Sequence, residues 1–246
     1  MWAPLKALIL HDCKSMVNFP EPNPMDHPLF KKIRNQFRSL VGPSAYEKLR
    51  YYYYLNFVPN AGYSRGYYLG GDAANSSYYG PFARAVIGQF NPKTVADIGC
   101  GSGGMSVAFK AQGCTVYPFD GSADSVALLK DKGIAAARQI DLTEAKEIPA
   151  QTDLCLCLEL AEHLPEKYAP HLCRLLAGVA PVLVFTASPP TQGGHLHVNL
   201  KEQSYWIALM KDVGLRYDGD AVKTIRANFG IKMLNDYDTN LMVFRR

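Results

Sequence analysis

The sequence lacks long apolar runs, paired cysteine motifs and clusters of basic residues. No stretch of its 246 residues approaches the roughly 18 consecutive apolar residues that a membrane-spanning helix needs. Its six cysteines form no CxxC pair, which excludes a zinc knuckle or a thioredoxin-type motif, and free thiols are typical of a reducing compartment. The short apolar stretch at the start has no small-residue cleavage site after it, so no signal peptide is expected. These absences predict a cytoplasmic protein with no membrane partner.

The charge balance also excludes a class of partner. Lysine and arginine number 26 against 22 acidic residues, which gives a net charge of only +4. The basic residues are scattered, and the densest groups are Lys31-Lys32 and Arg245-Arg246. Proteins that bind nucleic acid usually gather such residues on one face, so nucleic acid is not an expected partner. Nothing in the sequence indicates the oligomeric state.

The first 85 residues differ in composition from the rest of the chain. Four prolines between positions 20 and 28 make an irregular opening, and apolar spacing predicts a helix over 29–40. Ten of the fifteen tyrosines follow between positions 46 and 79, interleaved with glycines that favour partly irregular structure. We therefore predict that residues 1–85 form a lid or substrate-side extension and that residues 86–246 form the main domain.

From about residue 86 the sequence alternates between apolar strand patterns and amphipathic helix patterns. Such alternation is typical of an α/β fold with a parallel sheet that helices cover on both faces. Ser122 and Gly133 have the positions of a helix N-cap and of the glycine that ends a helix. The expected strands are 94–98, 115–119, 135–139, 154–158, 182–186 and 240–244. The expected helices are 103–111, 122–133, 166–177 and 203–213.

A glycine-rich turn joins the first of these strands to the first helix. Its residues run Asp97-Ile98-Gly99-Cys100-Gly101-Ser102-Gly103-Gly104. Glycine suits positions where the backbone must turn sharply or approach a ligand, and the helix start presents free N–H groups. The glycines satisfy both the GxGxxG spacing of dinucleotide-binding proteins and a GxGxG spacing. Asp120, about 20 residues further on, suits a ribose diol with either spacing. An NAD-dependent oxidoreductase therefore stays open at this point.

A second group of polar residues follows the fourth and fifth expected strands. Ligands bind beyond the carboxyl ends of strands in open α/β sheets, so these residues are expected at one site. In one interpretation they hold a divalent ion such as Mg²⁺ or Mn²⁺, which would lower the pKa of an acceptor hydroxyl. In a second, His163 or His197 is a general base assisted by Glu162. In a third, they only cap a helix and line a loop. The candidate metal ligands are Glu159, Glu162, His163 and His195.

Three motifs together carry a family resemblance. The stretches DIGCGSG, VYPFD ending in Asp120, and DLCLCLEL resemble class I S-adenosylmethionine-dependent methyltransferases over about residues 86–246. Asp97 decides against the dinucleotide pattern, which usually has an apolar residue there. The last helix and strand resemble the family's sixth-and-seventh-strand ending, which implies a Rossmann-like doubly wound sheet of seven strands. The cofactor residues that the resemblance implies are Asp97 at the methionine end, Gly99, Gly101 and Gly103 behind the amino-acid part, Asp120 at the ribose, Asp141 at the adenine, and Glu159.

The acceptor is less well defined by the sequence. The pattern ExxEHL at Glu159 resembles the metal site of small-RNA 2′-O-methyltransferases and of ubiquinone-pathway O-methyltransferases. The segment from Ser188 to Asn199, with Tyr205-Trp206, resembles bacterial small-molecule or sugar O-methyltransferases of glycan-related pathways. A hydroxyl acceptor needs deprotonation whereas an amine does not, so the carboxylate–histidine group favours oxygen. Tyrosines would stack on a sugar. The alternatives are a metal-dependent RNA ribose 2′-O-methyltransferase, which the scattered basic residues disfavour, and a non-catalytic S-adenosylmethionine-binding module.

Overall fold

The computed structural model describes residues 63–229 and 239–246 throughout, with residues 32, 35, 36, 39–42, 45, 46 and 49 before them. The chain divides into two units, residues 1–49 and residues 50–246. In the first unit the described positions are helical except Gly42, but Phe30, Ile33 and Phe37 of the helix expected over 29–40 lie outside the described residues. The same holds for the tyrosines at positions 51–54. The following description concerns the second unit.

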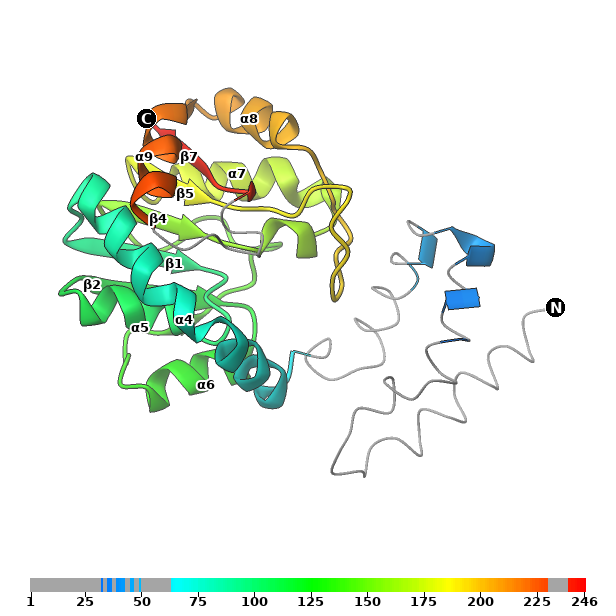
Figure 1. Ribbon diagram of the computed structural model, residues 1–246, viewed down its shortest axis with the longest axis horizontal. Helices are drawn as coiled ribbons and strands as arrows, with labels where there is room; N and C mark the ends of the chain where they lie inside the picture. Colours follow the sequence, from blue (N-terminus) through cyan, green and yellow to red (C-terminus); the bar gives the residue numbers. More distant parts are fainter. Residues whose placement is uncertain are drawn as a thin grey trace. The chain divides into compact units, whose positions relative to one another are not determined.

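One sheet of seven strands organises this unit (Figure 1). Its spatial order is β3-β2-β1-β4-β5-β7-β6, and β7 runs antiparallel to both of its neighbours. The order reverses between β1 and β4, which is where open α/β sheets bind ligands. The strands are β1 (Thr94–Ile98), β2 (Thr115–Asp120), β3 (Arg138–Gln139), β4 (Leu154–Cys157), β5 (Val182–Phe185), β6 (Arg216–Tyr217) and β7 (Met242–Arg245).

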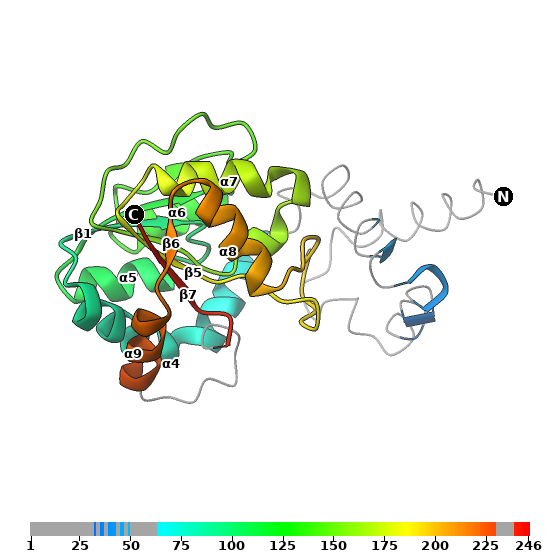
Figure 2. The ribbon, with the colours of Figure 1, turned by 90° about the horizontal axis from the view of Figure 1, so that it is seen from above.

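Helices cover both faces of the sheet (Figure 2). Helices α4, α5 and α9 pack on one face, α7 and α8 pack on the other, and α6 lies beside β2 and β3. The helices are α4 (Arg65–Phe90), α5 (Gly104–Ala111), α6 (Ala123–Asp131), α7 (Ala169–Ala177), α8 (Gln203–Asp212) and α9 (Gly219–Phe229). Two short 3₁₀ helices, Ala161–His163 and Glu166–Tyr168, follow β4. The predicted seven-stranded Rossmann-like fold is therefore confirmed.

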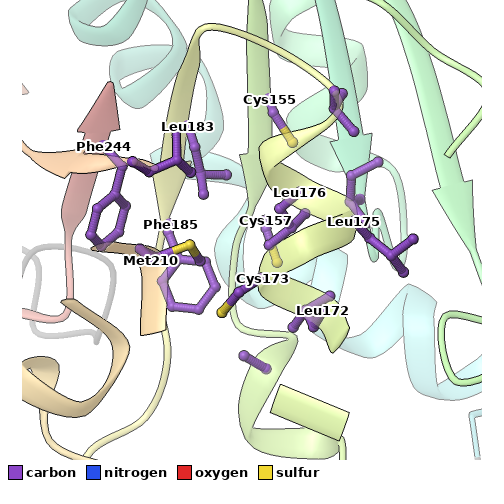
Figure 3. Close-up of a cluster of buried hydrophobic side chains, with 14 of the residues drawn as sticks. Cys155, Cys157, Leu172, Cys173, Leu175, Leu176, Leu183, Phe185, Met210 and Phe244 are labelled. Carbon is purple, nitrogen blue, oxygen red and sulfur yellow. The ribbon is translucent and has the colours of Figure 1, made fainter. Parts of the chain in front are cut away.

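Alternate strand residues supply the two cores. Leu154 and Leu156 of β4 face α4, α5 and α9, whereas Cys155 and Cys157 face α7 and α8. Figure 3 shows the second core, where Cys173 of α7 lies near the β4 cysteines. All strand residues of β4 are fully buried, as expected for a central parallel strand. The five cysteines within the described residues are free and buried, so burial explains them.

Helix α4 differs from the expectation of partly irregular structure. It runs without interruption through the tyrosine- and glycine-rich stretch from residue 65 and across Pro81. The hydroxyl of Ser64 caps its start by accepting from the amide of Tyr67, and its second half buries Phe82 and Val86 against the sheet. Packing thus outweighs the low helix propensity of four glycines between positions 66 and 80. The strand β6 and the helix α9 were also not foreseen. Of the helices in the described ranges, none has the length and apolarity to cross a membrane.

Candidate active site

The glycine-rich turn lies at the carboxyl end of β1 and leads directly into α5. Gly99, Gly101 and Gly103 all have positive φ angles, of 74°, 52° and 78°. Gly103 is the N-cap of α5 and provides no side-chain cap, and the hydroxyl oxygen of Ser102 accepts from the amide of Gly104 at 3.4 Å. A Cβ atom on Gly103 would lie only 2.6 Å from Cγ of Leu129. The turn therefore needs glycine for both its conformation and its packing.

Asp120 ends β2 and is tied to the same turn. Its carboxylate accepts from the amides of Gly101 and Ser122, both at 2.8 Å. Burial raises the pKa of Asp120, and the two amide hydrogen bonds oppose that rise. The backbone thus holds Asp120 in one orientation, with its carboxylate at the edge of the cavity that the turn lines.

Asp97 is buried deeper, within β1 itself. It is 3% exposed, and its Oδ2 accepts from the hydroxyl of Ser106 at 2.5 Å. Burial raises the pKa of Asp97 to about 6; Ser106 opposes this and Asp120 adds to it. A buried carboxylate destabilises the fold unless a positive group pairs with it. Buried carboxylates with raised pKa values are common at ligand sites.

The first half of α4 covers the turn with residues that the sequence did not single out. Tyr68 donates to Oδ1 of Asp120 at 3.5 Å. Asp72 accepts from the hydroxyl of Ser102 at 3.0 Å and forms an ion pair with Lys132 at 2.7 Å. The tyrosine bias of this segment was the only signal in the sequence that could have indicated them. The structure thus places α4 against the turn, while its role as a lid stays a prediction.

Glu159 and Glu162, which follow β4 in the chain, both contact Ser188. Ser188, which follows β5, donates to Oε1 of Glu162 at 3.0 Å and to Oε2 of Glu159 at 3.5 Å. Glu162 is fully buried, and burial together with the nearby Glu159 raises its pKa well above the usual value. Glu159 has a left-handed backbone with φ 52°, which a non-glycine residue adopts at a cost and often at functional sites. Ser188 was not predicted, although it lies at the expected edge of the sheet.

His163 stands between this carboxylate pair and α4. Its Nδ1 is 2.9 Å from the hydroxyl of Tyr63. Burial, together with the nearby His197 and His195, lowers the pKa of His163 to about 3, so its imidazole is neutral. Glu162, His163 and His197 each offer one ligand atom within 4.8 Å of the others, which is a spacing that can hold a metal ion. Within the described part of the chain, Oε2 of Glu162 has no hydrogen-bond partner.

His195 and His197, which follow β5, contact different neighbours. An extended stretch would direct His195 and His197 the same way, but a turn with Leu196 at φ 57° separates them. His197 joins the ring of His163 at 4.8 Å between centroids, whereas His195 contacts the rings of Tyr63 and Tyr67. In Figure 1 the yellow-to-gold loop after β5 approaches the cyan start of α4, in keeping with those contacts. The geometric metal cluster therefore contains His197, and neither His195 nor Glu159 belongs to it.

One cavity of about 980 Å³ connects the glycine turn to His163. Of the other predicted residues, all within the described part, Gly103, Glu162, His195 and His197 are not in its lining. Asp141 lines the cavity while its Oδ1 accepts from the amide and hydroxyl of Thr143, so it also stabilises a turn. The volume suits a ligand of nucleoside size. The predicted residues in the lining are Asp97, Gly99, Gly101, Asp120, Asp141, Glu159 and His163.

The protein is a Rossmann-like α/β protein with a buried carboxylate, Asp120, beside a glycine-rich turn. The profile of the family described as "Methyltransferase domain" matches residues 78–234. The match covers more than half of the chain, and the chain belongs to this family.

Curated relatives match over shorter stretches. The chain is 32% identical over 87 residues to the ubiquinone biosynthesis O-methyltransferase of Nitrosomonas europaea, covering 33% of this chain and 37% of that protein. It is 38% identical over 80 residues to the protein of that name from Pseudomonas paraeruginosa, covering 30% of this chain and 34% of that one. The match thus spans about a third of the length of these relatives.

Solved structures share the fold at low sequence identity. The mitomycin 7-O-methyltransferase MmcR has a TM-score of 0.61 and 15% identity, over 90% of this chain and 69% of that one. Human N-acetylserotonin methyltransferase in complex with SAM has a TM-score of 0.52 and 14% identity, over 78% and 59%. Both support the architecture alone.

Proposed function

We propose that this protein is an S-adenosylmethionine-dependent methyltransferase that methylates a hydroxyl oxygen of a small molecule. The observation that carries the proposal is the single cavity that joins the glycine turn and Asp120 to His163 and Glu159. Membership of the methyltransferase-domain family and the O-methyltransferase names of the curated relatives support it.

The residues around the turn fit this cofactor. Asp120 offers a fixed carboxylate to the ribose hydroxyls, the glycine-rich turn before α5 is proposed behind the amino-acid part, and Asp97 offers a buried negative charge to its ammonium group. Asp141 is proposed at the adenine, where it lines the cavity, and Glu159 beside the turn. When bound, S-adenosylmethionine supplies a methyl group on a charged sulfur, so the acceptor oxygen gains CH₃, loses its proton, and S-adenosylhomocysteine remains.

The proton of the acceptor must reach a base. His163 is the histidine that lines the cavity, and its neutral Nδ1 already accepts a hydrogen bond from a hydroxyl at 2.9 Å. A pKa near 3 makes an imidazole a weak base, so the protein must stabilise its protonated form during the reaction. Glu159, in the same lining, is the residue proposed to do so, and His197 supports the ring of His163.

As the alternative to a histidine base, we propose a divalent cation at Glu162, His163 and His197, because a neutral imidazole has one lone pair and cannot both bind a cation and accept a proton. The donor set is one carboxylate and two imidazoles, and Oε2 of Glu162 is a buried oxygen without a partner in the described residues. Nitrogen ligands favour Mn²⁺ or a similar transition metal over Mg²⁺, which prefers oxygen alone. Such a cation supplies a positive charge that lowers the pKa of a hydroxyl. Compared with the ligands expected from the sequence, this set contains His197 in place of His195 and omits Glu159.

Binding of S-adenosylhomocysteine tests the cofactor. Isothermal titration of the wild type should show binding, and Asp120→Asn should weaken it by about 10- to 100-fold, because a charge-assisted hydrogen bond contributes about 1.5–3 kcal/mol. The control is Asp220→Asn, whose carboxylate is exposed on α9 and pairs only with Lys223 at the surface. Binding of NADH in place of S-adenosylhomocysteine would overturn the assignment.

Methyl transfer tests the acceptor. Radiolabelled methyl groups should reach a small hydroxylated molecule rather than RNA, and EDTA should reduce the rate if the cation takes part. Cofactor binding without transfer to any hydroxyl compound would indicate a non-catalytic binding module.

We also propose that residues 1–85 form a substrate-side extension to the domain at 86–246. We propose further that the protein works in the cytoplasm, because the cysteines within the described residues are free thiols.

A further inference from the structure

The phenol side chain of Tyr63 lies inside the candidate active site. Tyr63 lines the cavity together with His163, and its hydroxyl is 2.9 Å from Nδ1 of that histidine. A phenol keeps its proton at neutral pH, so the hydroxyl of Tyr63 can donate to Nδ1 of His163. A hydroxyl on an aromatic ring is therefore already bound by the histidine proposed to face the acceptor.

Four rings surround this phenol, and we call them the aromatic box. Tyr67, His195 and His163 meet the ring of Tyr63 edge-on, with centroids at 5.2, 5.4 and 5.9 Å. Tyr68 stacks against it at 6.3 Å with an interplanar angle of 24°. Aromatic pairs prefer such edge and offset-stacked arrangements at about 4.5–7 Å. The box is thus complementary to one planar aromatic ring.

The box adjoins the residues proposed to bind the cofactor. Tyr68 stacks on the ring of Tyr63 and also donates to Asp120. Its ring would lie 3.7 Å from a Cβ atom on Gly101. One wall of the box is therefore shared with the glycine turn, as an acceptor subsite in this cavity requires.

We infer that Tyr63 occupies the acceptor subsite and that the methyl acceptor is a phenol, whose ring replaces that of Tyr63 in the aromatic box and whose hydroxyl takes over its bond to His163. This inference rests on the proposed function. A sugar would press several hydroxyl groups against ring edges, and burying such groups without partners costs free energy. Tyr63 directly precedes the N-cap Ser64, so it can leave the box without unwinding α4.

The test uses p-cresol, which is the tyrosine side chain without its backbone. Tyr63→Ala empties the box, and by titration it should bind p-cresol at least tenfold more tightly than the wild type does. Tyr217→Ala is the control, since it removes an equal phenol that is 40% exposed on β6. Adding His163→Ala to Tyr63→Ala should weaken p-cresol binding about tenfold, to the level of toluene.

Equal p-cresol binding by the wild type, Tyr63→Ala and Tyr217→Ala would overturn the inference. Equally tight binding of cyclohexanol or methyl β-glucoside to Tyr63→Ala would also overturn it. If Tyr63→Ala does not fold, wild-type protein decides: with S-adenosylmethionine it should convert p-cresol to 4-methylanisole and leave methyl β-glucoside unmethylated, and the reverse pattern refutes the phenol. S-adenosylhomocysteine is titrated into the same samples. Its binding without any p-cresol binding removes the acceptor assignment alone, whereas p-cresol binding without it removes the proposed function and leaves only a phenol-binding site.

Discussion

Gly194 offers a direct way to move His197 without replacing it. A Cβ atom at Gly194 would lie 2.1 Å from Nε2 and 2.3 Å from Cε1 of His197. Ordinary contact begins near 3.4 Å, so the imidazole must retreat by about 1.3 Å in Gly194→Ala. Bonds between metal and ligand tolerate about 0.2 Å, and the shift would remove one of the three ligands. We expect the affinity for Mn²⁺ to fall by at least about 10- to 100-fold.

The cost to folding should be much smaller than the cost to the site. The clashing atoms belong to a side chain that can rotate, so the free energy of unfolding should fall by about 1–3 kcal/mol at most. The neighbouring glycine is a matched control, because a Cβ atom on Gly193 would meet nothing within 4 Å. Gly193→Ala should therefore change both stability and Mn²⁺ affinity very little, within about 0.5 kcal/mol.

The assay combines Mn²⁺ titration, followed by the electron paramagnetic resonance of the free ion, with thermal unfolding of the same samples. Wild type and Gly193→Ala should bind one Mn²⁺ alike, and Gly194→Ala should bind it weakly while staying folded at 25 °C. If Gly194→Ala and Gly193→Ala bind Mn²⁺ equally well, the placement of His197 in the cation site is refuted. If the wild type itself binds no Mn²⁺, the cation proposal fails and only the folding comparison stands.

Three further predictions concern the cofactor turn and the histidine in the cavity. The pKa of Asp97 is raised to about 6 from 3.8, so wild-type affinity for S-adenosylhomocysteine should fall about tenfold per pH unit below 6, whereas Asp97→Asn should show no such dependence. The folded state holds this proton more tightly than the unfolded state, so the free energy of unfolding of the wild type should fall as pH rises from about 4 to 6. At pH 7, urea unfolding should show Asp97→Asn to be up to about 3 kcal/mol more stable than the wild type. Gly103→Ala should lose about 2–5 kcal/mol and its S-adenosylhomocysteine binding, since strain at positive φ adds to the clash with Leu129; Gly113→Ala, at φ 91° in open space, should lose only about 1–2 kcal/mol and bind normally. Methyl transfer by His163→Ala should be at least about 100-fold slower, whereas His171→Ala on α7 should keep the rate; equal rates would exclude His163 as the base.

Much of the fold follows from local pattern. The bounds of β1 and the capping of α6 by Ser122 match the expectation because a buried central strand and an N-cap each leave a short, specific signature. Helix α4 does not, since glycine and tyrosine argue against a helix locally and only packing of its second half on the sheet stabilises it. Strand β6, two exposed residues long, has no pattern of its own and depends on pairing with β7.

The alternating fold, and the closeness of Asp120 to the glycine-rich turn, could be predicted from the chain alone. About 20 residues separate the glycine-rich turn from Asp120. The parallel strands β1 and β2 bring both to the same edge of the sheet. The arrangement of the residues around His163 depends instead on how distant parts of the chain pack together. Whether His195 or His197 joins Glu162 depends on the left-handed turn at Leu196, and Tyr63 reaches His163 across 100 residues because α4 packs over the sheet edge. Contacts of that kind arise from how separate elements pack, and no local spacing in the chain encodes them.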